Sequence, residues 1–150
     1  MQTSAYQHGP PEVAAVTGHK FEVTSYGVCA DCHGSAANAE GLVGLTHGLV
    51  TNQIQQVKAR LDTWAATKAP GSLYATYGTR AWEYTTPGDL SSGGSGPSSA
   101  EQALIPDNIK KARFDLYLVL YDGSYGVHNG PYAFTLLKSA GTWVEQELNK

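Results

Sequence analysis

Apolar residues recur at helical spacing in three stretches of the chain, and these stretches predict its main helices. In the first, from about residue 49 to residue 67, an apolar side chain returns every three or four positions, as on one buried helix face. This stripe consists of Val50, Ile54, Val57, Leu61 and Trp64. Thr51 is a suitable N-cap for this helix, and Pro70-Gly71 is suited to end it.

The other two helical stretches follow one another in the C-terminal part of the chain. One helix is expected from residue 107 to about residue 121, and the last begins near Pro131, because proline suits a first turn. One face of the earlier helix carries Ile109, Ala112, Leu116, Tyr117 and Leu120. Phe114, Leu118 and Val119 lie on a second face, so we expect both sides of this helix to be covered. The stripe of the last helix consists of Ala133, Leu137, Ala140, Val144 and Leu148.

The remaining segments lack a clear period. Residues 1–28 are expected to be extended and irregular, residues 34–48 to form a loop or short turns, and residues 70–106 fit no element. Within the last of these, the polar, Gly- and Ser-rich run 87–100 is typical of a flexible surface loop. We therefore expect residues 1–150 to form one mainly α domain with about three main helices and long irregular loops.

The run Cys29-Ala30-Asp31-Cys32-His33 indicates what these helices and loops surround. It has the form C-x-x-C-H, which is the attachment signature of a c-type haem. Two thiols add to the two vinyl groups of the porphyrin, and the histidine after the second cysteine is held beneath the iron as its proximal ligand. Cys29 and Cys32 are the only cysteines of the chain. The sequence thus predicts one covalent haem c in a small cytochrome c-type helical domain.

Other uses of a C-x-x-C pair fit the sequence less well. A thioredoxin-like pair prefers a strand–helix setting, whereas a short polar segment, residues 24–28, precedes this motif. A zinc site needs two further ligands at finger-like spacing, and neither a second C-x-x-C nor an H-x3-5-H pair follows. A disulfide across two residues would be strained and would stabilise little. Haem attachment is therefore the favoured interpretation.

Composition limits the partners and the compartment. Only 15% of the residues are charged and the net charge is −3, so no basic run indicates nucleic acid or an anionic membrane. No apolar stretch is long enough to span a bilayer, and residues 1–4 do not begin a signal peptide. Because haem is attached to this motif outside the bacterial inner membrane, we expect a mature or excised chain that works in the periplasm or outside the cell.

The second axial ligand of the iron decides the chemistry. The only methionine is Met1, so a His/Met pair is not expected, and the choice lies among a second histidine, a weak ligand such as lysine, and an open position. His128 is the first choice, because it lies in a tight turn between two apolar helices where Gly126 and Gly130 permit close approach to the porphyrin. A helix cap or a surface position is the alternative for this histidine. The remaining candidates, in order, are His19, His47 and His8.

Two segments resemble multihaem c-type cytochromes. The run Gly18-His19-Lys20-Phe21, followed by C-x-x-C-H, resembles a "GH-x-F … C-x-x-C-H" module. Residues 121–129 (YDGSYGVHN) are similar to the "D-x-S-x-G-x-H-N-P" turn of the multihaem nitrite reductase and hydroxylamine oxidoreductase group, in which the histidine commonly serves as a distal haem ligand. The resemblance implies this role for His128. Here Gly130 intervenes before the proline, and this chain has a single haem motif where those relatives have several.

Electron transfer through one bis-histidine, low-potential haem is the leading functional hypothesis, because two strong axial ligands leave no position for a substrate. Redox proteins or neighbouring haem domains are the expected partners, and enzymatic activity is not expected. Two alternatives stay open: a haem sensor or enzyme with an open iron, and a haem module of a larger assembly or filament, an oligomer included, that shares axial histidines between subunits. Tyr125, Tyr132 and Trp64 are candidates for lining the haem pocket, and core packing explains them equally.

Overall fold

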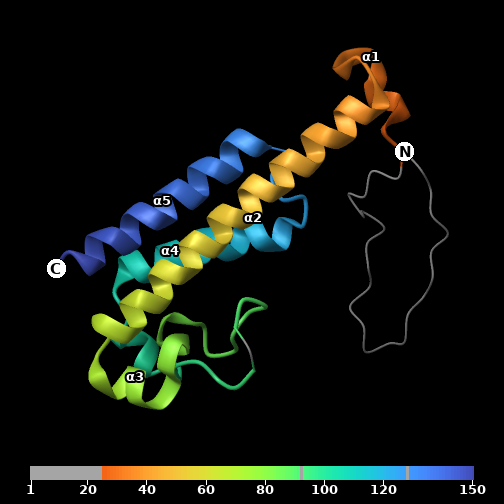
Figure 1. The fold of residues 1–150 in the computed structure, drawn as a ribbon. Helices are drawn as coiled ribbons and strands as arrows, with labels where there is room; N and C mark the ends of the chain where they lie inside the picture. Colours follow the sequence, from red (N-terminus) through yellow and green to blue (C-terminus); the bar gives the residue numbers. More distant parts are fainter. Residues whose placement is uncertain (1–24, 92, 128) are drawn as a thin grey trace, which may run out of the picture.

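Three long helices form the body of the molecule (Figure 1). Helix α2 (Ala36–Thr67) packs against both members of a helical hairpin, α4 (Asp107–Asp122) and α5 (Gly130–Leu148). No strand occurs in the part of the chain that is described, so the prediction of a mainly α fold is confirmed. The computed structural model describes residues 25–91, 93–127 and 129–150.

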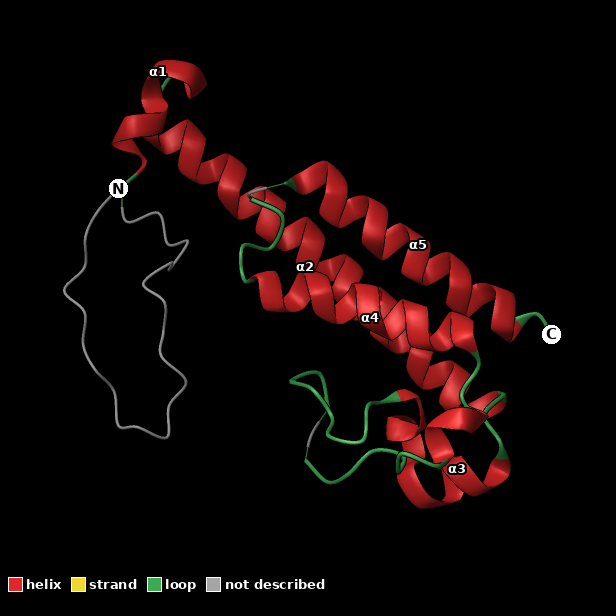
Figure 2. Cartoon of the chain, turned by 180° about the vertical axis from the view of Figure 1, so that it is seen from behind, coloured by secondary structure: helices red, strands yellow, loops and turns green. Residues whose placement is uncertain are grey.

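Shorter helical elements lie at the two ends of α2 (Figure 2). At its N-terminal end are the 3-10 helix η1 (Tyr26–Cys29) and α1 (Ala30–His33). At its C-terminal end are α3 (Gly71–Tyr77) and the 3-10 helix η2 (Gly78–Trp82), with η3 (Glu101–Leu104) preceding α4. Among the described helices, none is both long and apolar enough to cross a membrane.

The core confirms the predicted helical stripes. All five residues of the first stripe are buried, and none is more than 4% exposed. From α4 and α5 the buried stripe residues are Ile109, Ala112, Leu116, Tyr117, Ala133, Leu137, Ala140 and Val144. Both bounds of α4 and the start of α5 also lie within one residue of the expected ones, and Pro131 occupies the first turn of α5.

The start of α2 differs from the prediction. Residues 34–48 do not form a loop, because Gly34 ends α1 in a left-handed conformation (φ 78°) and Ser35 then caps a new helix. The Ser35 hydroxyl accepts a hydrogen bond from the Asn38 N–H at 3.0 Å. Thr51 therefore lies inside α2 and is not its N-cap. The glycines of this segment lower helix propensity by about 1 kcal/mol each, and the neighbouring alanines and leucines offset this cost.

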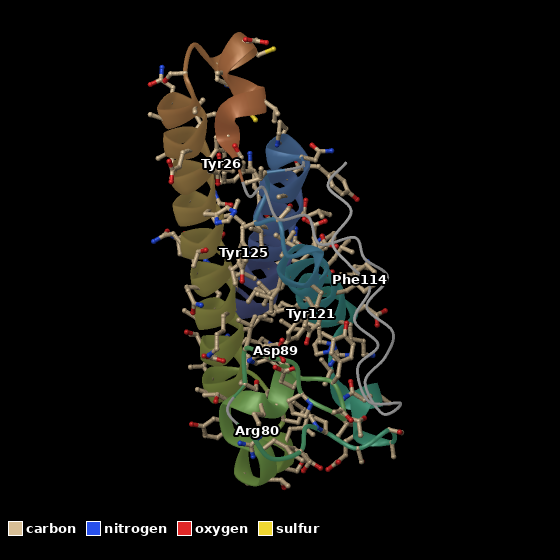
Figure 3. The ribbon with its side chains drawn as sticks, turned by 90° about the vertical axis from the view of Figure 1, so that its right-hand side faces the viewer. Tyr26, Arg80, Asp89, Phe114, Tyr121 and Tyr125 are labelled. Carbon is tan, nitrogen blue, oxygen red and sulfur yellow. The ribbon has the colours of Figure 1, made fainter. Side chains whose placement is uncertain are left out.

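One face of α4 is less covered than expected. Val119 is buried, but Phe114 and Leu118 are 58% and 43% exposed. Figure 3 labels Phe114 together with Tyr121, which is exposed on the same helix. The prediction that both sides of α4 are covered is therefore wrong, because the apolar pattern alone does not say how many neighbouring elements are available to cover a helix.

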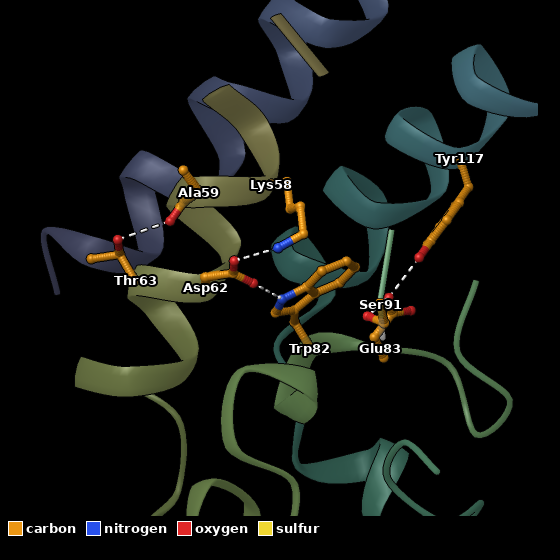
Figure 4. A network of polar contacts seen from close by, with 8 residues as sticks. All are labelled: Lys58, Ala59, Asp62, Thr63, Trp82, Glu83, Ser91 and Tyr117. Atoms are coloured by element: carbon orange, nitrogen blue, oxygen red, sulfur yellow. Dashed lines mark hydrogen bonds and ion pairs between the residues drawn. The ribbon is translucent and has the colours of Figure 1, made fainter. Parts of the chain in front are cut away.

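A partly buried set of polar contacts holds the segment before α4 onto the long helices (Figure 4). The indole N–H of Trp82 donates to Asp62 Oδ1 of α2 at 2.9 Å, and Lys58 Nζ donates to Asp62 Oδ2 at 2.6 Å. Glu83 is fully buried, and its Oε1 accepts a hydrogen bond from the Tyr117 hydroxyl of α4 at 2.5 Å. Burial, followed by this bond to the carboxylate, raises the pKa of Tyr117. These bonds position the α3–η2 end of the fold relative to α2 and α4.

Residues 87–100 contain no helix or strand among their described positions, as expected for a loop. The end of the loop is nevertheless bonded to its surroundings. The Pro97 carbonyl accepts hydrogen bonds from Thr85 Oγ1 at 2.9 Å and from Gln102 Nε2 at 3.0 Å. The Gly96 N–H donates to the Thr85 carbonyl at 3.1 Å, so the run closes back onto the segment that follows η2.

A pH-dependent stability follows from Asp115 of α4, which is only 8% exposed and whose pKa is raised by burial. Between its unfolded and folded pKa values, the folded state binds more protons, so the free energy of unfolding falls as pH rises through this window. Asp115→Asn removes the ionisable carboxyl, and with it this fall in the free energy of unfolding. We expect the variant to melt at a higher temperature than the wild type near neutral pH, and the difference to shrink toward about pH 3.9.

Thermal melts across this pH range measure the effect, with the exposed Asp89→Asn as the matched control. Equal melting temperatures of wild type and Asp115→Asn at neutral pH would contradict the assigned burial of this carboxyl.

Candidate haem site

The C-x-x-C-H motif lies on a compact helical turn. Cys29 ends η1, and Cys32 and His33 lie in α1 directly after it. The Ser25 hydroxyl begins this turn by accepting a hydrogen bond from the Gly27 N–H at 3.4 Å. Cys29 is half-buried, whereas Cys32 and His33 are exposed. Both thiols and the imidazole are thus presented by one short run of backbone, as attachment to a single macrocycle requires.

The motif is attached to the first turn of α2. The side-chain amide of Asn38 donates to the main-chain carbonyl of His33 at 3.4 Å, and the Asn38 N–H is itself bonded to Ser35. Helix α2 also packs against both η1 and α1. The position of His33 therefore depends on the start of α2, which is the boundary that the hydrophobic pattern did not predict.

A cavity of about 510 Å³ opens beside the motif. Its walls come from three parts of the chain: the motif, the N-terminal half of α2, and the turn before α5. The lining residues are Tyr26, Cys29, His33, Ala39, Leu42, Val43, Thr46, Gly126, Val127, Gly130, Pro131 and Phe134. Cys29 and His33, four residues apart on a helical path, both face this cavity.

The turn before α5 forms another wall of the cavity, and it lies very close to α2. Gly126 has φ 84°, and a Cβ placed on it would come within 2.9 Å of Val50 Cγ2. Only glycine combines this left-handed conformation with so close an approach. The preceding residue, Tyr125, also has a positive φ of 48°, and its ring lies 5.3 Å from the ring of His47 on α2. Figure 3 labels Tyr125 beside α2 and Tyr26 nearer the motif.

The chemistry of the lining suits an apolar macrocycle. No Asp, Glu, Lys or Arg is among the described residues that line the cavity, and most of this wall is aliphatic, aromatic or glycine. Sites for cofactors are typically apolar and of roughly 300–1,000 Å³, so the volume falls in the expected range. A thiol and an imidazole at one wall supply the groups that attach and ligate a haem. The residues present therefore fit the group that the motif predicts.

The structure brings together only some of the predicted site residues. Cys29 and His33 line the cavity. Cys32, which directly precedes His33 on α1, is exposed. His47 is exposed on α2 beside Tyr125 and does not line the cavity. His128, His19 and His8 lie outside the described residues.

The aromatic lining differs from the one considered from the sequence. Tyr125, Tyr132 and Trp64 do not line this cavity, and Trp64 belongs to the core. Tyr26 and Phe134 are the aromatic residues that do line it. Both have a local sequence signal: Tyr26 lies three residues before Cys29, and Phe134 lies one helical turn after Gly130.

Comparisons with protein-family models, with curated proteins and with solved structures each found no match for this chain. Within residues 25–91, 93–127 and 129–150, no three His, Cys, Asp or Glu side chains gather closely enough to hold a bare metal ion. The assignment of the site therefore depends on the motif and on the cavity beside it.

The contact of Gly126 with α2 gives a testable difference between two glycines. Gly123 and Gly126 both have positive φ, but a Cβ on Gly123 would meet nothing within 4 Å. We expect Gly123→Ala to cost about 1–2 kcal/mol for the left-handed backbone alone. Gly126→Ala adds the clash with Val50 and should cost a further ~1–3 kcal/mol. Urea unfolding measures both, and equal costs would show that the turn does not press on α2.

Proposed function

We propose that this chain carries one covalent haem c and transfers electrons through it. The observation that carries the proposal is that Cys29 and His33 of the C-x-x-C-H motif line an uncharged, largely apolar cavity of cofactor size. Neither the motif nor a cavity alone would be as specific, because C-x-x-C pairs have other uses and small cavities are common. A haem bound there supplies one-electron redox chemistry.

Each residue of the proposed site has a defined role. Cys29 and Cys32 hold the ring by thioethers, and His33 is the proximal ligand of the iron. His128 is proposed as the distal ligand, with His19 as the second choice. Support for His128 comes from its sequence neighbours, since Val127 and Gly130 on either side of it line the same cavity as His33. Two histidine ligands favour a lower potential than a His/Met pair.

The remaining lining residues exclude water and fix the ligands. Leu42, Val43 and Phe134 make the wall apolar, so charge at the site is poorly solvated and nearby dipoles act strongly. The Asn38 bond to the His33 carbonyl restrains the proximal side. Because no position would stay open to a substrate, we propose a carrier rather than an enzyme, acting with redox proteins or neighbouring haem domains in the periplasm or outside the cell.

Covalent attachment is the first prediction of this proposal. Expressed with a c-type haem attachment system, the wild-type chain should retain haem after acid–acetone extraction. Cys29→Ala and Cys32→Ala should each lose one thioether, which shifts the pyridine haemochrome band because one vinyl group stays free. The double variant should lose covalent haem completely. Retention by the double variant, or no haem on the wild type, would contradict the proposal.

Axial ligation is tested by absorption spectra of the oxidised and reduced protein with and without CO. The wild type should be low-spin and unchanged by CO, because both axial positions are filled. His128→Ala should open one position and bind CO, whereas His19→Ala and the exposed control His47→Ala should not.

Two other results are informative. A CO-binding His19→Ala with an unchanged His128→Ala would assign the distal ligand to His19. CO binding by the wild type would reject the bis-histidine carrier in favour of an open-iron sensor or enzyme.

A further inference from the structure

The N-terminal half of α2 carries an apolar seam that the described residues leave about half exposed. The seam consists of Leu42, Leu45 and Leu49, which are 49%, 59% and 50% exposed. In Figure 1 this part of α2, together with α1, extends beyond α5. Three half-exposed leucines in a row on one helix form a patch of the kind that marks an interaction site.

The spacing of the seam is that of a coiled-coil contact. Leu42, Leu45 and Leu49 follow at intervals of three and four, which are successive a and d positions of a heptad. Exposed asparagines lie seven residues before and seven residues after Leu45, at positions 38 and 52. The pattern N-x3-L-x2-L-x3-L-x2-N is therefore nearly the same in either direction along the helix.

The surroundings of the seam are suited to contact with the same surface of a second copy of the chain. Between residues 25 and 57 the only Asp, Glu, Lys or Arg residues are Asp31 and Glu40, and Glu40 lies on the side of α2 opposite the seam. The seam is flanked by Gly41 and Gly48, where an added Cβ would meet nothing within 4 Å. Two copies of this face would meet without like charges opposing each other, and the small flanking residues would let the two helices approach closely.

We propose that this seam binds a second copy of the chain, with the two α2 helices antiparallel about a two-fold axis near Leu45. The two-fold then places Asn38 opposite Asn52 of the partner subunit and Leu45 opposite the partner's Leu45, while Leu42 and Leu49 face glycines, so no leucine meets a charge. This inference rests on the proposed function in one respect. Leu42 belongs to both the seam and the cavity wall, so the dimer brings two haem sites toward each other for electron exchange.

The seam is short, which sets the strength of the contact. Residues 38–52 span about 21 Å of helix. Redox encounters at the small end of the interface range bury less than about 1,200 Å². We therefore expect reversible association with a dissociation constant in the micromolar range, visible as a mass that rises with concentration.

Sedimentation equilibrium of the haem-loaded chain, from low micromolar to near-millimolar concentration, tests the proposal. The wild type should approach the mass of two chains, and Leu45→Glu/Leu49→Glu should stay monomeric with an unchanged far-UV circular dichroism spectrum. Leu104→Glu is the matched control, because Leu104 is also 50% exposed but lies on η3, outside the seam. A monomeric wild type at every concentration, or equal association of the seam variant and the control, would overturn the proposal.

A second variant tests the orientation, does not depend on burying glutamates, and leaves Asn38 and its bond to the His33 carbonyl unchanged. Asn52→Lys places two lysines together in a parallel dimer, whereas in the antiparallel dimer each lysine meets Asn38 of the partner subunit. We expect association close to that of the wild type at both low and high salt. Weaker association at low salt that added salt restores would overturn the antiparallel contact.

Pyridine haemochrome assays on the same samples separate this inference from the proposed function. A dimer without haem would support the proposed contact through the seam and contradict the proposed electron carrier. A haem-loaded monomer would support the electron carrier and contradict the contact through the seam.

Discussion

The close approach of Gly126 to α2 is the contact on which the cavity depends. The turn before α5 lies against Val50 and Thr46 with no room for a side chain at position 126. This contact sets the distance between the turn and the motif, because both are positioned by the same helix. If the turn moved away from α2, the wall formed by Val127, Gly130 and Pro131 would move away from Cys29 and His33.

Helix α2 serves the core and the candidate site with different parts of its length. From Val50 onward its buried face packs against α4 and α5, and the Trp82–Asp62 bond ties its C-terminal half to η2. Before Val50 the same helix lines the cavity and carries the motif through the Asn38 bond to His33. Because α2 is one continuous helix, packing of its C-terminal half in the core also holds its N-terminal half, and the candidate site on it, in place.

The sequence predicted most of the core, because burial follows the helical period in α4, α5 and the second half of α2. It failed at residues 34–48, where the abundance of Gly and Ala suggested a loop. The overlooked signal was local: Gly34 followed by Ser35 is suited to end one helix and cap the next. Exposure of Phe114 and Leu118 was also missed, since periodicity identifies an apolar face but not whether another element covers it.

The candidate site, like the fold, could be predicted only in part from the sequence. The motif predicted Cys29, Cys32 and His33 as site residues, because the chemistry it indicates depends on spacing within five residues. The aliphatic wall from α2 and the aromatic residues Tyr26 and Phe134 depend on contacts between distant segments, which spacing cannot express. The sequence predicted that Gly126 permits close approach to the porphyrin, whereas the close approach that the structure shows is to Val50 of α2.

The most direct test of the central claim is the intact mass of the denatured wild-type chain after production in cells that attach c-type haem. One covalent haem predicts a mass increase equal to a single haem, with fragmentation placing it on the peptide that contains Cys29 and Cys32. An unmodified mass, or a haem that leaves on denaturation, would contradict the claim that this cavity is built around a haem c.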